Sequence, residues 1–395
     1  MENFSKNVNE KYLRDLSKSK NEPEWMLKKR LEALNKFFEL TMPNFKYGMN
    51  IKLKYDFDFD KIDFDSNNSQ IELASVNKVI FDTFENVLNS EKQIVRDHFM
   101  KLIDNDNKFI ALNSALFDKG ILIYVPKNIK VKDSVMLSSL QSSKSFMKYI
   151  LIILDENSRL NFIDDISSDY KEEHYSSNVI EIFLKENAKL NYIKIQNLSL
   201  NAYNFDHKKA KIEKNAELSL YDLNFGSKLT YSNTTANLDG ENSKFESYNL
   251  FLGSMNQQFD LGLEAIHNYP YTYSNMLSRG ALNNESKAIY RGLIKINKNA
   301  ANSNGYQKEE TILLSEKSES DSIPKLEIEN SEVKCSHGAS ISHIDEDKLF
   351  YLMSRGLEEK EAKQELVKGF FEIILSKIKL DNLEKIQAII EEKIK

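Results

Sequence analysis

One short stretch near the C-terminal end of the chain carries the residue types best suited to metal or sulfur chemistry. The stretch E-V-K-C-S-H-G-A-S, residues 332–340, holds Cys335, the single cysteine among 395 residues, two positions before His337. Residues i and i+2 of an extended strand share a face, so the thiol and the imidazole would point the same way. Both groups bind zinc, iron or copper, but a closed tetrahedral site needs four donors. A metal site here must therefore be completed from elsewhere.

Two other interpretations of Cys335 and His337 stay open on the residues alone. A cysteine nucleophile with a histidine base would gain from Lys334, because a nearby positive charge lowers the pKa of a thiol. Side chains two apart on a flat strand lie side by side, however, and no third group that would orient the histidine is apparent. The remaining interpretation is a buried thiol that packs as a small hydrophobic group. His343 shares the same face only if the strand continues unbroken past Gly338.

Composition and motifs exclude several classes of protein. The formal charge is -6 and there is no basic tract, so we expect no nucleic-acid partner. A single cysteine cannot form an internal disulfide, and the polar N-terminus lacks a secretory signal, which predicts a cytoplasmic protein. The longest apolar run, residues 149–154, is far shorter than the roughly 18 residues of a membrane span. Neither G-x-x-x-x-G-K-[ST] nor G-x-G-x-x-G occurs, so we expect no nucleotide bound by this chain itself.

The region that must position Cys335 and His337 has the pattern of stacked β-coils. From about residue 109, short stretches of period two follow one another, rich in β-branched and aromatic residues. Within them a turn-like phrase recurs at intervals of 30, 28 and 27 residues: E-N-S-R-L at Glu156, E-N-A-K-L at Glu186, K-N-A-E-L at Lys214 and E-N-S-K-F at Glu241, with looser echoes at Asn284 and Lys298. Such spacing is typical of a solenoid that turns a corner once per coil. A β-sandwich is the alternative, although 12 glycines and 5 prolines are few for its turns.

Helical patterns stand at both ends of the chain. Residues 9–40 and 75–102 have apolar residues at helical spacing, and Asp345 can cap a C-terminal helix that ends at Gly356. Two wide apolar stripes follow, within residues 366–394, and they either close on each other as a small bundle or receive a partner. The chain thus divides into an N-terminal helical region (1–104), a β-core (105–343) and a C-terminal helical region (344–395).

Four phrases of the sequence resemble a known family. They are V-K-C-S-H-G-A-S with the D-E-D-K-L-F-Y-L-M-S-R-G that follows it, N-E-P-E-W-M-L-K-K-R near the N-terminus, A-L-N-S-A-L-F-D-K-G-I-L-I-Y-V-P-K-N from Ala111, and P-K-L-E-I-E-N from Pro324. They are similar to the SufB/SufD family, the paired scaffold proteins of the Suf iron–sulfur cluster assembly system. C-S-H-G-A is the SufD form of the last motif. The SufB form has E-H-E-A there and a sulfur-accepting cysteine before a Leu-Leu pair, where this chain has K-E-E-T-I before Leu313 and Leu314.

The resemblance implies a fold and a set of partners. The fold is an all-β core, a right-handed parallel β-helix or solenoid, flanked by N-terminal and C-terminal helical regions. The function is that of a scaffold subunit without enzymatic activity in a SufBCD complex, with a SufB-like subunit and a SufC-like ATPase as partners. By resemblance, Cys335 and His337 lie at the SufB interface and hold one side of a nascent iron–sulfur cluster or its iron, shared with the partner chain. His337 is the better ligand of the two.

The resemblance also implies a second contact and leaves two rival functions. Phe350, Tyr351, Arg355 and Gly356 become candidate contacts for the SufC-like ATPase. A sulfur-carrier enzyme that uses Cys335 is the first rival, and a carbohydrate-active β-helix, suggested by the repeat alone, is the second. One strand departs from the family pattern, because A-N-S-N-G-Y-Q, residues 301–307, stands where the family tends to have A-Q-x-T-D-x. The resemblance assigns no role to that strand.

Overall fold

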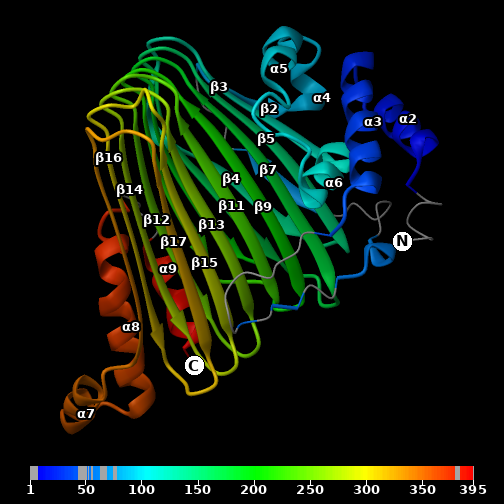
Figure 1. Cartoon of the computed structure of the whole chain (residues 1–395). Coiled ribbons are helices and arrows are strands. Elements are labelled where there is room, and N and C mark those ends of the chain that lie inside the picture. The colour runs from blue at the N-terminus through cyan, green and yellow to red at the C-terminus, as the bar shows by residue number, and fades with distance from the viewer. Residues whose placement is uncertain are drawn as a thin grey trace.

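The core of the chain is a parallel β-solenoid with two flattened sides (Figure 1). The computed structural model describes residues 8–42, 51, 53–54, 57–62, 69–73, 78–378 and 383–394. Within these residues the chain passes alternately between two nine-stranded sheets, so that each sheet grows by one parallel strand per coil. The predicted solenoid is confirmed, and the alternative of a β-sandwich is wrong. No helix of the described ranges has the length and apolar character needed to cross a bilayer.

The two sheets take alternate strands of the chain. In spatial order, sheet A contains β1 (Gln70–Leu73), β4 (Lys130–Gln141), β6 (Arg159–Ser168), β8 (Lys189–Asn197), β10 (Glu217–Asn224), β12 (Lys244–Gly253), β14 (Tyr273–Leu282), β16 (Asn304–Leu313) and β18 (Lys334–His343). Sheet B contains β2 (Ile80–Thr83), β3 (Lys119–Val125), β5 (Ser145–Leu154), β7 (His174–Leu184), β9 (Ala202–Ile212), β11 (Leu229–Leu238), β13 (Gln258–His267), β15 (Lys287–Ile296) and β17 (Glu319–Ile328).

The recurring phrase of the sequence forms the corners at which the chain passes from sheet B to sheet A. Its four asparagines, Asn157, Asn187, Asn215 and Asn242, have φ between 57° and 60°. Asparagine tolerates this left-handed conformation better than most residues, which explains why it recurs there. The amide of Asn187 also donates to the side chain of Asn157 at 2.9 Å, so successive corners are linked. Of the two looser echoes, Asn284 lies at the opposite corner, between β14 and β15.

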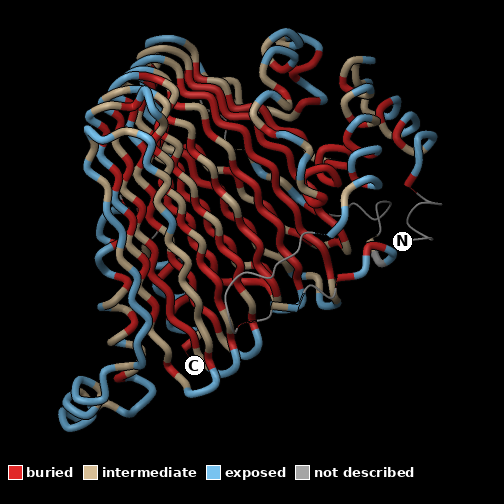
Figure 2. The backbone as a smooth tube through the Cα atoms, viewed as in Figure 1, coloured by how far each residue is buried: buried red, intermediate tan, exposed pale blue. Residues whose placement is uncertain are grey.

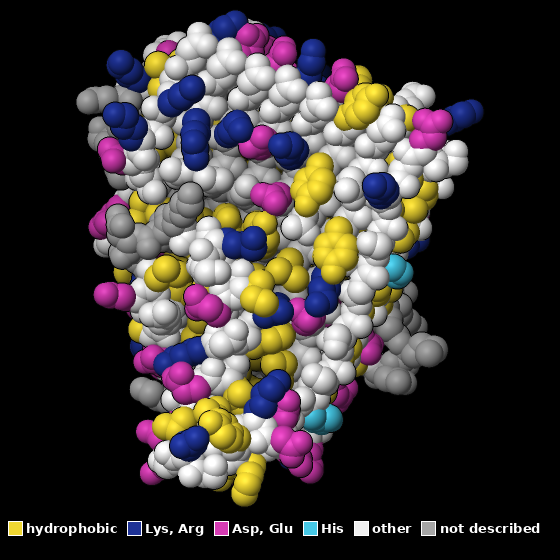
Figure 3. All heavy atoms as spheres, turned by 90° about the vertical axis from the view of Figure 1, so that its left-hand side faces the viewer, with side chains coloured by type: hydrophobic (Ala, Val, Ile, Leu, Met, Phe, Trp, Pro, Cys, Tyr) yellow, Lys and Arg dark blue, Asp and Glu magenta, His cyan; other side chains and the backbone are white. Residues whose placement is uncertain are grey.

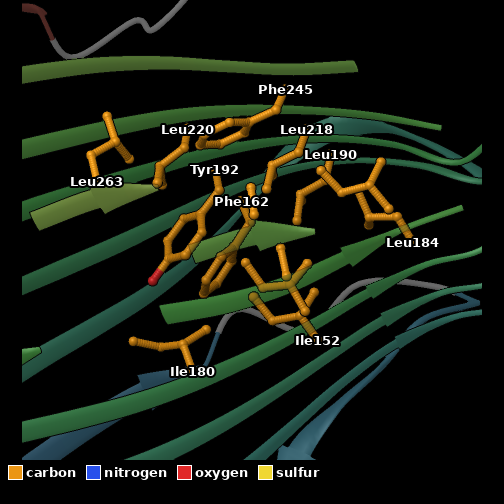
Figure 4. Close-up of a cluster of buried hydrophobic side chains, with 14 of the residues drawn as sticks. Ile152, Phe162, Ile180, Leu184, Leu190, Tyr192, Leu218, Leu220, Phe245 and Leu263 are labelled. Atoms are coloured by element: carbon orange, nitrogen blue, oxygen red, sulfur yellow. The ribbon is translucent and has the colours of Figure 1, made fainter. Parts of the chain in front are cut away.

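The space between the sheets is apolar along one part and polar along another. Leucine, isoleucine and phenylalanine side chains of successive coils meet between the sheets (Figure 4). Beside them, sheet A presents an inward column in which each member is the register neighbour of the next, and most members are polar. The column reads Asp164, Lys194, Asp222, Asn249, Ser278, Glu309 and Ala339. Such a column is costly unless its charges are paired.

In the first coils these interior charges are paired across the two sheets. Lys148 of β5 lies 3.0 Å from Asp164, and Lys194 pairs with Asp206 of β9. Lys208 in turn lies 2.8 Å from Asp222. All six of these side chains are almost completely buried, so the pairs must satisfy each other.

The N-terminal helices cover the outer face of sheet B. They are α2 (Glu10–Ser19), α3 (Glu24–Glu39), the short α4 (Phe84–Val87), α5 (Lys92–His98) and α6 (Lys108–Leu116), with a 3-10 turn at Phe59–Lys61. Buried Glu181 of β7 accepts hydrogen bonds from the backbone N–H groups of residues 100–103, at 2.6 to 3.1 Å, which fixes this region to the sheet. The helices predicted within residues 9–40 are confirmed. A continuous helix over 75–102 is wrong, because β2 precedes α4; residues 75–77 lie outside the described residues.

Two C-terminal helices, α8 (Glu359–Leu375) and α9 (Leu383–Lys393), cover the outer face of sheet A. The helix before them, α7 (Glu346–Ser354), has no buried residue and projects beyond the sheet (Figure 1). The apolar stripes of α8 and α9 pack on outward-facing side chains of β6 to β14, including Leu223 and Leu250. On α9, Lys385 forms an ion pair with Asp165 of β6. The outer face of the solenoid buries these stripes. They therefore form neither of the two predicted arrangements, a separate small bundle or a surface for a partner.

The two ends of the solenoid differ. At the N-terminal end, β1 pairs antiparallel with β4, and β2 pairs antiparallel with β3, so both first edges are covered. At the other end, β17 and β18 are the last strands of their sheets, with no described strand beyond them. The burial pattern follows this difference: the strands of the first coils are buried, whereas the last are half-buried or exposed (Figure 2).

Candidate functional site

Cys335 and His337 lie on β18, the open edge of sheet A. The strand is continuous from Lys334 to His343, and Gly338 does not interrupt it. Its register with β16 places Cys335 over Gly305 and His337 over Gln307, two residues that are directed between the sheets. The inward row of β18 therefore reads Cys335, His337, Ala339, Ile341 and His343. The predicted common face of Cys335 and His337 is confirmed, and His343 shares it.

Cys335 closes the apolar part of the interior at this end. Its side chain is half-buried and packs against the core, and a Cβ atom on Gly305 would lie 3.3 Å from its sulfur. Glycine at position 305 thus provides space for the thiol. Burial raises the pKa of the Cys335 thiol above its usual value. Lys334 precedes it on the strand and points to the opposite face, which removes the expected lowering of the thiol pKa.

His337 is exposed on the same edge. Among the residues that the structure describes, no three histidine, cysteine or acidic side chains are close enough together to hold a metal ion. Cysteine and histidine are suitable donors for iron, yet the described residues bring fewer than three such donors together at any point. Cys335 and His337 therefore lie side by side on one face of a strand whose other edge no described strand covers.

One coil further in, Glu309 lies under the inward row of β18. It is 1% exposed and its register neighbour is Ala339. One carboxyl oxygen accepts a hydrogen bond from Thr311, and the other, Oε2, is buried without a hydrogen-bond partner. Burial raises the pKa of Glu309 to about 7, although the hydroxyl groups of Thr311 and Ser322 oppose the rise. Glu309 was not predicted from the sequence; its signal was an acidic residue at an inward position of the strand that departs from the family pattern.

The second predicted surface lies on α7. Asp345 caps this helix by accepting from the N–H of Lys348 at 3.1 Å, and Gly356 follows it with φ 99°, as the sequence predicts. None of the residues of α7 is buried, and Phe350 is 73% exposed and Tyr351 56%. The guanidinium group of Arg355 lies 5.4 Å from the ring centre of Tyr351. Figure 3 views the side of the molecule that carries β16 and α8, and hydrophobic side chains gather at its foot, at the level of α7.

Comparison with known proteins places this geometry in context. Residues 136–370 match the family model described as "SUF system FeS cluster assembly, SufBD core domain", and residues 60–137 match the model of the SufBD protein N-terminal region. A protein of Staphylococcus epidermidis named "Iron-sulfur cluster assembly SufBD family protein" is 30% identical over 97% of this chain and 92% of its own length. A relative from Staphylococcus aureus, also described as an iron-sulfur cluster assembly SufBD family protein, is 30% identical with the same coverage of both chains.

Proposed function

The chain belongs to the SufBD family of the SUF iron–sulfur cluster assembly system, and we propose that it acts there as a SufD-like scaffold subunit without enzymatic activity of its own. In this proposal the open end of the solenoid pairs with a SufB-like subunit, and Cys335 and His337 supply one side of a site for a nascent cluster or its iron. The cluster is the cargo of the complex. The single cysteine, without a disulfide partner, is in keeping with assembly in the cytoplasm.

The observation that carries the proposal is the uncovered last coil. Ile296 of β15 and Ile328 of β17 are register neighbours in the same inward column, but Ile296 is 0% exposed and Ile328 is 44% exposed. Ile341 of β18 is 39% exposed in the same way. Unpaired edge strands with apolar side chains favour pairing with another chain, and natural proteins usually cover or charge such edges. The half site lies on this edge, so pairing there would also supply the missing donors.

The contact with a SufC-like ATPase is placed on α7. Phe350, Tyr351 and Met353 form an exposed apolar group on a helix that has no buried residue. Arg355 and Gly356 close the helix beside this group. Aromatic residues and arginine are the types that dominate binding energy at protein interfaces, which supports this assignment.

The rival sulfur-carrier enzyme has less support. A sulfur carrier needs a reactive thiolate, whereas burial raises the pKa of the Cys335 thiol and Lys334 lies on the other face of the strand. If Cys335→Ser leaves cluster assembly intact while His337→Ala stops it, the carrier function is excluded. The reverse result would favour the carrier over the scaffold.

The pairing is tested by changing the edge and, as a control, an equally exposed position elsewhere. Ile341→Lys places a charge on the open edge, and Ile373→Lys does so on α8, where Ile373 is 49% exposed. We expect Ile341→Lys to weaken co-purification with tagged SufB-like and SufC-like partners by at least about tenfold, roughly 1.4 kcal/mol of binding free energy. Ile373→Lys should co-purify like the unchanged chain. Equal recovery of both variants would contradict the assignment of the edge.

The site is tested on the assembled complex. Iron and sulfide are measured after reconstitution of the unchanged complex and of the His337→Ala variant. We expect His337→Ala to lower bound iron severalfold while the subunits still co-purify. Unchanged iron content would remove His337 from the proposed site.

A further inference from the structure

The interior column of sheet A ends directly beneath the edge that carries His337. Glu309 is the last acidic member of this column, one strand further in than β18. Gln307 lies directly under His337, and Glu309 lies under Ala339, two positions further along the same inward face. Glu309 and His337 are therefore diagonal neighbours on adjacent strands.

The diagonal is short enough for the two side chains to meet. Neighbouring strands are about 4.8 Å apart and two residues of a strand span about 6.6 Å, which gives about 8 Å between the two Cα atoms. Long side chains on such diagonals can touch. Ala339 of β18 lies directly over Glu309 and offers only a methyl group there. The contact requires the imidazole of exposed His337 to turn toward Ala339 and to reach the buried carboxyl group past that methyl group.

Glu309 and Gln307 each have a buried side-chain oxygen without a hydrogen-bond partner, Oε2 and Oε1 respectively, but the amide of Gln307 is directed to sheet B. Oε2 of Glu309 is buried and accepts no hydrogen bond, which is costly for a carboxyl oxygen. Gln307 donates to the backbone carbonyl of Lys325 at 3.1 Å, and its own oxygen lies 2.3 Å from where a Cβ atom on Gly292 would be. The amide of Gln307 thus reaches across to sheet B, away from the edge.

We propose that Glu309 is a positioning residue for His337, accepting a hydrogen bond at Oε2 from one ring N–H while the other ring nitrogen binds the metal. A neutral histidine that binds a metal through one nitrogen donates from the other, and a carboxylate in that place fixes the tautomer and the direction of the ring. This inference rests on the proposed function in one respect, that His337 is a ligand. No covalent or redox step is involved.

The test uses the full-length chain, alone and in complex with a SufB-like subunit, with Zn²⁺ as a diamagnetic probe. Only this chain is labelled with ¹⁵N-histidine, and His337 is identified by the loss of its signals in His337→Ala. We measure the Zn²⁺ affinity and the ring nitrogen that carries the proton in the zinc-bound state. Glu309→Leu and Gln307→Leu form a matched pair, because both positions are 1% exposed on the same face of the same strand.

The expected results separate a positioning role from a structural one. Removal of the acceptor in Glu309→Leu should lower the Zn²⁺ affinity about 10-fold to 100-fold and mix the two tautomers of His337. Glu309→Asp should recover most of the affinity, and Glu309→Gln, which keeps an acceptor without the charge, should lie between. Gln307→Leu should change the affinity less than about threefold. Urea unfolding of each variant checks that it is folded.

Two results would overturn the inference. One is a Zn²⁺ affinity and tautomer in Glu309→Leu equal to those of the unchanged chain. The other is an equal or larger loss in Gln307→Leu, which would transfer the role to the residue directly under His337. If no complex with the SufB-like subunit forms, the proposed function fails by itself. The measurement on the chain alone still decides whether Glu309 directs His337.

Discussion

The two ends of the solenoid differ in whether the chain covers the edges of its own sheets. At the N-terminal end the chain covers its own first edges with β1 and β2, and Ile71, Leu73, Val79 and Phe81 pack on the core. At the C-terminal end no strand of the described ranges covers β17 or β18, and apolar residues of the inward columns are exposed. A repeat structure needs a cap at each end. At the C-terminal end a second chain could act as that cap.

The interior follows the same division. Near the closed end, acidic and basic side chains form buried pairs from one sheet to the other. Near the open end, Glu309 has no ion pair among the described residues, and one of its oxygens has no partner. The charges of the closed end therefore stabilise the chain itself, whereas the carboxyl group at the open end costs stability and remains free for another contact.

We expect the largest loss of stability when one of the buried ion pairs at the closed end is broken. Asp206→Ala leaves Lys194 buried without its carboxylate and removes acceptors of Asn178 and Asn204. We expect the free energy of unfolding to fall by about 3–5 kcal/mol, measured by urea denaturation. The double variant Lys194→Met with Asp206→Leu, which removes both charges, should lose less. A loss under about 1 kcal/mol in Asp206→Ala would show that the interior pairs do not stabilise the coils.

At the open end the corresponding change should show as a dependence on pH. The pKa of Glu309 is raised from 4.5 to about 7, so the folded chain keeps this proton while the unfolded chain releases it. The free energy of unfolding of the isolated chain should therefore fall between about pH 4.5 and 7, by about 3 kcal/mol from this group. Glu309→Gln cannot release a proton and should lack that part of the fall. Parallel curves of stability against pH for the two proteins would contradict the assignment.

The smallest effect concerns α7, beyond the open end. Gly356 has φ 99° and no atom within 4 Å of an added Cβ, so Gly356→Ala should cost about 1 kcal/mol through backbone strain alone. Gly369 lies within α8 and is equally uncrowded. Gly369→Ala should instead stabilise the helix by up to about 1 kcal/mol, because alanine favours helical backbone. Hydrogen exchange of the amide groups of α7 and α8 measures the two changes in stability. If Gly356→Ala stabilised α7, the predicted backbone strain at position 356 would be ruled out.

The sequence predicted the architecture better than the site. Corner asparagines recur because each coil repeats the same left-handed turn, so spacing alone indicated a solenoid, and period two placed Cys335 and His337 on one face. The packing of α8 and α9 on the outer face of sheet A was not predicted, because the apolar stripe of a helix does not show which surface it packs against. Glu309 was missed because its inward direction depends on the register between β16 and β18, which links residues thirty positions apart.

The alternating column of the interior also fixes the order of the coils. Asp164, Lys194 and Asp222 follow one another on neighbouring strands of sheet A. If β6 paired with β10 instead of β8, the carboxylates of Asp164 and Asp222 would meet in a space closed to water. This mispairing would cost more free energy than a mispairing of apolar side chains. Coils that are nearly alike in shape are thereby made distinct by charge. The buried charges thus favour one order of the coils, and this order also determines the length of the solenoid from its closed end to its open end.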